Sequence, residues 1–189
     1  MTEPIEYTGA MIALVPSDAD AKRLVTEGGE PLDQLHLTLL YLGDAVELDQ
    51  STRDELVAWA REAVGPWDSI EGDLDSSAWF SPTGAEPCLV MLANGLDLAE
   101  FHETVVADVS EFVSLPDQHA PWRPHFTLFC SDDDAMQFSD TFVEAGRDRV
   151  GAITFDRLRL AFGGDVIDIP FDGEETPEPG QPPEPDDAT

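Results

Sequence analysis

Two short stretches of the chain repeat the pattern His-x-Thr-x inside an apolar run. Residues 36–39 read HLTL within LHLTLLYLGD, and residues 125–128 read HFTL within WRPHFTLFCSD. Side chains alternate between the two faces of a β-strand, so the imidazole and the hydroxyl of each motif share one face. One such motif is typical of a core histidine beside a strand-forming threonine. Two of them in the same apolar setting indicate a common, catalytic cause.

The doubled pattern predicts acid–base chemistry on a phosphodiester. If the two motif faces oppose each other across a cleft, His36 and His125 supply two imidazoles, and Thr38 and Thr127 supply two hydroxyls. A neutral histidine then removes a proton from the attacking hydroxyl or water, while a protonated histidine donates to the leaving oxygen. The hydroxyls hold the non-bridging phosphate oxygens, where negative charge grows. These steps require no metal, and the residue types leave open which histidine is the base.

A small set of residues near the motifs has the chemistry to bind a nucleotide. Arg123 precedes His125 by two positions and is a candidate phosphate contact. Its alternative role is a surface ion pair with one of the many acidic residues. Trp79, Phe80 and Trp122 are candidate stacking platforms for a nucleobase, although large aromatic residues more often fill a core.

Other residues with chemically versatile side chains receive structural interpretations. Tyr41 is expected on the strand face away from the first motif histidine, as a packing residue. His102 and His119 have no threonine partner or metal-ligand spacing and are interpreted as incidental. Cys88 and Cys130 lie in apolar surroundings and are expected to be reduced packing residues. No Gly-rich phosphate loop, Ser-His-Asp arrangement or Cys-x-x-Cys pattern is present, and no metal or other cofactor is expected.

The elements that must position the motifs follow the same order in both halves of the chain: strand, helix, motif strand, helix, strand. This repeat predicts a pseudo-symmetric α+β protein. In the first half the expected elements are strand 11–15, a helix capped by Ser17 or Asp18, strand 35–42, a helix ending at Gly65 and an extended segment 67–80. In the second half they are strand 88–93, an amphipathic helix from about 96, strand 125–130, a helix after it, and strands 153–162 and 166–171.

The composition limits the partners of this protein. Nine lysines and arginines stand against forty acidic residues, which gives a net charge of −31. Such a surface repels long nucleic acids, because their sequence-independent binding depends on cationic contacts. We therefore expect a small nucleotide or short oligonucleotide substrate, no membrane partner and a monomeric state. The acidity also fits solubility or adaptation to high salt, which the composition does not separate from a functional role.

The ends of the chain differ from the folded part. Residues 172–189 carry seven acids, five prolines and no basic residue, which predicts a disordered tail after a folded region at 1–171. That region is expected to divide into lobes at roughly 1–82 and 83–171. The apolar run near the N-terminus is short and lacks a basic flank, so we expect no signal peptide and a cytoplasmic location, in the host cell if the protein is phage-encoded.

The segments HLTLLYLG and RPHFTLF resemble the two signature motifs of the two-histidine (2H) phosphoesterase superfamily, which includes 2′-5′ RNA ligase-like proteins and cyclic phosphodiesterases. The resemblance extends from MIALVP to the last strand near IDIPF and leaves out the tail. It implies two pseudo-symmetric lobes with antiparallel sheets facing a central cleft. It also implies metal-free hydrolysis or transesterification of cyclic phosphates or 2′-5′ linkages, with His36 and His125 as base and acid.

The resemblance leaves several functions open. The opening TGAMIALVPSDADAKRL and the Lys-poor composition resemble versions encoded by phages of high-GC hosts, which implies destruction of a host signalling nucleotide as a counter-defence role. RNA-end processing or ligation is the alternative within the same chemistry. A non-catalytic nucleotide-binding or virion interaction module is the alternative from another class, although binding alone does not require two proton-transfer groups.

Overall fold

The computed structural model describes residues 8–81, 87–130 and 149–171. The first half of the chain forms three strands and two α-helices in the expected order. A short 3₁₀ turn, η1, precedes the motif strand, so His36 lies just before that strand begins. The elements are β1 (Gly9–Pro16), α1 (Asp18–Leu24), η1 (Leu32–Gln34), β2 (Leu37–Asp44), η2 (Ala45–Glu47), α2 (Gln50–Val64) and β3 (Ile70–Phe80).

The second half repeats this order as far as the structure describes it. The helix that the sequence predicts after the second motif and the acidic tail both lie outside the described residues. The Gly163-Gly164 turn joins the last two strands as expected. The elements are β4 (Cys88–Asn94), α3 (Leu96–Val109), β5 (His125–Cys130), β6 (Gly151–Phe162) and β7 (Asp165–Pro170).

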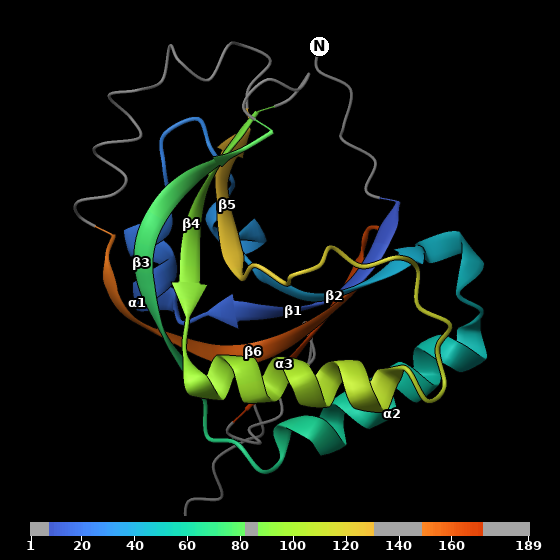
Figure 1. The fold of residues 1–189 in the computed structure, drawn as a ribbon. Coiled ribbons are helices and arrows are strands. Elements are labelled where there is room, and N and C mark those ends of the chain that lie inside the picture. The colour runs from blue at the N-terminus through green and yellow to red at the C-terminus, as the bar shows by residue number, and fades with distance from the viewer. Residues whose placement is uncertain (1–7, 82–86, 131–148, 172–189) are drawn as a thin grey trace, which may run out of the picture.

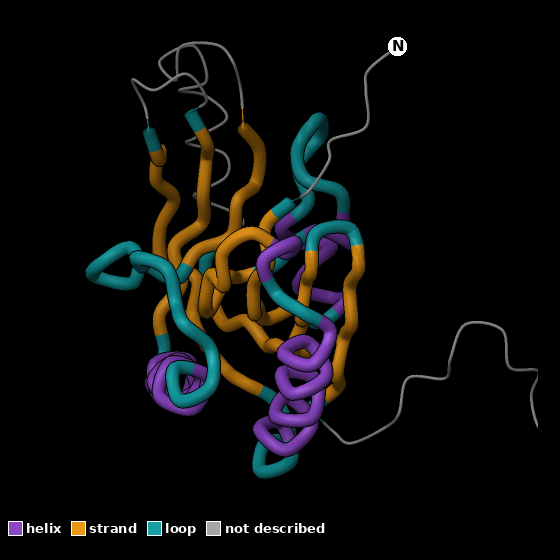
Figure 2. The backbone as a smooth tube through the Cα atoms, turned by 90° about the vertical axis from the view of Figure 1, so that its right-hand side faces the viewer, coloured by secondary structure: helices purple, strands orange, loops and turns teal. Residues whose placement is uncertain are grey.

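Within the described residues the strands form one curved, antiparallel seven-stranded sheet, which confirms the α+β class (Figures 1 and 2). The strand order is β1-β2-β5-β4-β3-β6-β7, and a further pairing of β1 with β6 closes the first six strands into a ring. Each half of the chain pairs a strand with the other half: β3 pairs with β4, and the C-terminal part of β6 pairs with β1. These pairings hold the halves together around the motif strands.

The helices pack against the sheet, and their buried side chains form one apolar core with it. Helix α3 contacts β2 and β3, while α2 contacts β6 and β7. Helix α3 runs along one end of the strands in Figure 1. Five positions are predicted to form its apolar stripe, and the side chains at four of them are fully buried: Leu98, Phe101, Val105 and Val109. The fifth, Phe112, follows the end of the helix and is half-buried against the core. No helix in the described part of the chain is long and apolar enough to span a membrane.

The expectation that both cysteines are reduced is wrong, because Cys88 and Cys130 form a disulfide. The two residues lie directly opposite each other on neighbouring strands β4 and β5. Their separation of 42 positions gives no short-range signal of a pair, so only the register of the strands brings them together.

Candidate active site

The two motif strands meet at a single residue pair, Leu37 of β2 with Phe126 of β5. One residue to either side of this pair, the antiparallel register sets His36 beside Thr127 and Thr38 beside His125. Leu37 and Phe126 are fully buried, whereas the four motif side chains are partly exposed on the other face. The motifs thus converge through a strand pair with local two-fold symmetry, rather than across the space between two opposed sheet faces.

Each motif ends in a β-bulge at its fourth position. In β2, Ala13 pairs with Thr38 and Ile12 with Leu40, which leaves Leu39 without a partner in β1. In β5, Val90 pairs with Thr127 and Leu89 with Phe129, so Leu128 is the extra residue. Bulges of this kind turn the following side chains to the other face and are common beside active sites.

The bulge in β2 reverses the orientation expected for Tyr41. Tyr41 pairs with Met11, on the same face as the Thr38 hydroxyl, which contacts the Met11 sulfur at 3.7 Å. The Tyr41 side chain lines the cleft and is 46% exposed. The prediction that Tyr41 faces away from the motif histidine is therefore wrong, because strict alternation does not survive the bulge.

Both catalytic candidates are held in the same way. The Nδ1 atom of His36 lies 2.7 Å from the carbonyl oxygen of Gln34, and that of His125 lies 2.7 Å from the carbonyl oxygen of Arg123. A carbonyl oxygen only accepts, so each Nδ1 carries a proton and donates it. The Nε2 atom of each ring remains for the substrate, as base in the neutral ring or as acid in the protonated ring.

The surroundings of His36 favour its neutral form. Burial lowers the pKa of the His36 imidazole, and the charges of Arg159 and His125 lower it further, although the hydrogen bond to Gln34 acts in the opposite direction. Since a neutral imidazole is the form that accepts a proton, His36 has the properties of a general base.

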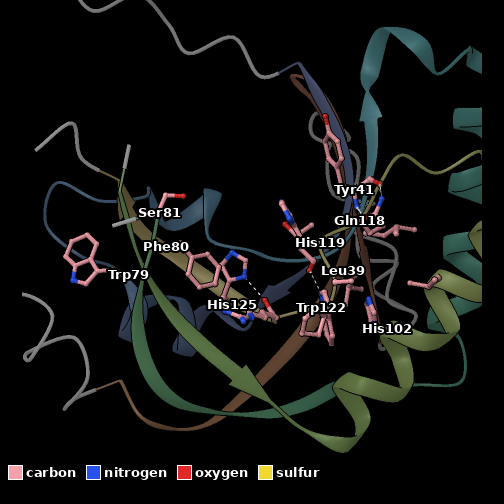
Figure 3. Close-up of a pocket in the computed structure, with 16 residues that line it drawn as sticks. Leu39, Tyr41, Trp79, Phe80, Ser81, His102, Gln118, His119, Trp122 and His125 are labelled. Carbon is pink, nitrogen blue, oxygen red and sulfur yellow. Dashed lines mark hydrogen bonds between the residues drawn. The ribbon is translucent and has the colours of Figure 1, made fainter. Parts of the chain in front are cut away.

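A cleft of about 800 Å³ opens beside the motifs (Figure 3). Thr38 and His125 are among its lining residues, and the Phe80 ring lies 4.6 Å from the His125 ring. Trp122 lines the cleft, donates from Nε1 to the Thr38 carbonyl at 3.2 Å and stacks on His102 at 3.7 Å. Figure 3 shows these aromatic side chains on two sides of the site.

No acidic residue lines the cleft within the described part of the chain, although forty of the 189 residues are acidic. By proportion, about three of its sixteen lining residues would be acidic. Three histidines line it instead, namely His102, His119 and His125, together with Arg123. Among the described residues the Arg123 guanidinium forms no ion pair with an acid. The charge distribution fits an anionic ligand.

The predicted binding residues fall into two groups. Phe80, Trp122 and Arg123 line the cleft near His125. Trp79 also touches the cleft, but its ring packs edge-on against Phe129 at 5.7 Å and lies apart from Phe80 and His125 in Figure 3. The rings of successive strand residues point to opposite faces, which separates these two neighbours.

Several cleft residues were not expected from their sequence positions. His102 lines the cleft from α3, where its ring stacks on Trp122. Burial lowers the pKa of the His102 imidazole. Gln118 donates to the Tyr41 carbonyl at 2.9 Å and accepts from the Tyr41 amide at 3.3 Å, so it continues the sheet edge and forms part of the wall. His119 follows in the same exposed loop. The position of this loop along β2 is a tertiary feature without a local sequence signal.

Comparison with solved structures identifies the class of fold. TT0787 of Thermus thermophilus is 19% identical with a TM-score of 0.58, over 88% of this chain and 100% of that one. Kluyveromyces marxianus Usb1 is 14% identical with a TM-score of 0.54, over 88% and 100%. E. coli LigT complexed with 3′-AMP is 16% identical with a TM-score of 0.50, over 87% and 95%. These structures define a 2H phosphoesterase fold.

The family follows from the sequence itself. The model of the 2′-5′ RNA ligase superfamily matches residues 19–162, which include both motifs and most of the chain. This protein therefore belongs to the 2′-5′ RNA ligase superfamily of 2H phosphoesterases. No curated protein matches the sequence. Membership supports phosphodiesterase or RNA-processing activity.

Proposed function

We propose that this protein is a metal-independent phosphodiesterase that cleaves a small nucleotide phosphodiester with two histidines as base and acid. The observation that carries this proposal is the matched pair of motifs. Two imidazoles, each bound through Nδ1 to a carbonyl oxygen, lie diagonally across a strand pair from each other, with a threonine hydroxyl beside each. Binding alone would not require two proton-transfer groups in such equivalent positions.

In the proposed reaction His36 removes the proton from the attacking hydroxyl or water as the new bond from oxygen to phosphorus forms. His125 donates its Nε2 proton to the leaving oxygen as the old bond breaks. Thr38 and Thr127 donate hydrogen bonds to the non-bridging oxygens, whose charge increases in the transition state. The Thr38 hydroxyl is available for this role, because its contact in the structure is a weak sulfur acceptor. Proton exchange with water restores both rings.

The cleft supports a substrate of one or a few nucleotides. Its volume of about 800 Å³ lies in the upper part of the range of small-molecule sites, roughly 300–1,000 Å³. Phe80 and Trp122 offer apolar ring surface for bases, and Arg123 offers a cation for phosphate. The net charge of −31 disfavours long nucleic acids. The candidates are a cyclic mono- or oligonucleotide signal, a 2′,3′-cyclic phosphate and a 2′-5′ linkage.

RNA-end processing is the second candidate function. It is supported by the family, whose members are described as 2′-5′ RNA ligases. Ligation is the reverse of the same phosphoryl transfer and uses the same two histidines with their roles exchanged, His125 as the base and His36 as the acid. A single-stranded end would fit the cleft where a long duplex would meet the acidic surface of the chain.

Turnover of a substrate panel in EDTA tests the proposal. The panel contains 2′,3′-cyclic mononucleotides, 2′-5′ and 3′-5′ dinucleotides, cyclic di- and trinucleotides, and short RNAs with a 2′,3′-cyclic end. The control is the double variant His36→Gln, His125→Gln, which keeps polar side chains at both positions. Cleavage by the wild type alone supports the proposal, and the best substrate separates signal destruction from RNA-end processing. Binding of a cyclic nucleotide without turnover would favour a binding module.

A further inference from the structure

The two halves of the site differ in charge at one matching position. In the first half, a row of paired residues crosses the sheet from Thr38 through Ala13 to Arg159, and Arg159 pairs with Asp168. Because paired residues in neighbouring strands share a face, Arg159 lies on the face that carries Thr38.

In the second half the corresponding row runs from Thr127 through Val90 to Ala78. Ala78 therefore occupies the position that Arg159 occupies in the first half. The local two-fold symmetry of the motifs is broken by this one guanidinium, which lies on the His36 side.

Arg159 is held rigidly in its place. Its Nε and Nη2 atoms donate to the two carboxylate oxygens of Asp168, both at 2.7 Å, and Nη1 donates to the Asp33 carbonyl at 2.8 Å. The residue is 8% exposed and is the only buried charged side chain within the described residues. A planar fork bound at three points fixes orientation better than a flexible ammonium group.

The contact to Asp33 links Arg159 to the ring of His36. Asp33 lies in the turn η1, and the next residue, Gln34, supplies the carbonyl that accepts from His36 Nδ1. The charged neighbours that act on His36 are Arg159 from β6 and His125 from β5, and both lower its pKa.

We propose that Arg159, braced by Asp168, is a positioning residue for His36: it anchors the turn whose Gln34 carbonyl orients the His36 ring, and this asymmetry makes His36 the base and His125 the acid. The inference rests on the proposed two-histidine function. It adds a residue that lies outside both motifs and does not touch the substrate. Arg159 acts through the backbone of η1 and through its charge.

Three variants separate positioning from charge. Arg159→Gln removes both the cation and the forked contact, while Arg159→Lys keeps the cation and loses the fork. Arg157→Gln is the matched control: Arg157 lies two residues away on the same face of β6, and its contacts are Asp156, Asp18 and the Pro16 carbonyl. If Arg159→Gln does not fold, the double variant Arg159→Gln, Asp168→Asn takes its place, because it leaves no unpaired carboxylate at position 168.

The first readout is an NMR titration of the histidine ring protons, which needs no substrate and is simplified by the four histidines of the chain. The His36 pKa should rise in Arg159→Gln, stay near the wild-type value in Arg159→Lys, and be unchanged in Arg157→Gln. An unchanged His36 pKa in Arg159→Gln, or an equal rise in Arg157→Gln, would overturn the proposal whether or not the substrate has been found.

The second readout is the pH profile of turnover on the best panel substrate. Misplacement of a catalytic group by about 1 Å costs on the order of 100-fold, so kcat should fall about 10- to 100-fold in both Arg159 variants with little change in KM. The acidic limb should move to higher pH in Arg159→Gln alone. If kcat and the acidic limb match those of Arg157→Gln, Arg159 has only a structural role and the proposal fails.

Discussion

Substitution of Trp122 by Phe should weaken the site through a single lost hydrogen bond. In the structure the Trp122 Nε1 atom donates to the Thr38 carbonyl, in the strand that carries the first motif. A neutral hydrogen bond of this kind contributes about 1 kcal/mol. If Thr38 depends on it for position in the transition state, kcat/KM should fall about five-fold, since about 1.4 kcal/mol corresponds to ten-fold.

Substitution of Trp122 by Ala should be more severe. A large aromatic side chain buries roughly 150–250 Å², and Trp122 is half-buried. Half of that area at about 25 cal/mol per Å² gives roughly 2–3 kcal/mol, in addition to the hydrogen bond. We therefore expect the free energy of unfolding to fall by about 3 kcal/mol. The variant also loses the stacking contact to His102.

The assay is urea unfolding and kcat/KM side by side, with Trp59→Phe as the matched control. The Trp59 Nε1 atom donates to an Asp108 carboxylate oxygen at 3.1 Å between α2 and α3, away from the cleft. Both Phe variants should lose about 1 kcal/mol or less of stability, but only the Trp122 variant should lose activity. Wild-type kcat/KM in Trp122→Phe, or an equal loss of kcat/KM in Trp59→Phe, would show that the Trp122 hydrogen bond does not position Thr38.

Three further outcomes follow from the packing and the charges. Gly29→Ala should lower the free energy of unfolding by about 1–3 kcal/mol, because a Cβ at Gly29 collides with the Leu128 carbonyl at the second bulge; an unchanged urea midpoint would contradict this. Phe126→Ala should cost about 3–5 kcal/mol by urea unfolding, because Phe126 is fully buried and stacks on Phe155; a loss below about 1 kcal/mol would show that this contact is not part of the core. The acidic limb of kcat/KM, measured from about pH 4 to 8, should lie below the ordinary histidine pKa of about 6.5, because burial lowers the pKa of the His36 base and keeps it neutral to lower pH; a limb above that value would assign the base elsewhere.

The motifs and the order of elements could be predicted because both depend on local patterns. The apolar stripe of α3 and the alternation within each motif are visible over a few residues. The end of α2 is marked by Gly65 as expected, and Asp49 caps its start through the Thr52 amide at 2.8 Å.

The features that could not be predicted depend on register between distant strands. Tyr41 faces the cleft because of a bulge at Leu39, which the sequence HLTLLYLG does not mark. Cys88 and Cys130 become partners only when β4 and β5 align.

The network around Arg159 is a second case. It joins β6 to a turn 126 positions earlier in the chain. An arginine in an apolar strand gives no sign of such a partner, since ion pairs across a sheet are set by tertiary packing.

The most direct test of the central claim is turnover of the best panel substrate in EDTA by His36→Gln, by His125→Gln and by the double variant. General acid–base catalysis contributes about 10²- to 10⁴-fold per group. Each single variant should therefore lose at least about 100-fold in kcat while keeping the wild-type urea midpoint. The double variant should lose less than the product of the two single losses, because the histidines act in one step. Full turnover by either single variant would contradict the account.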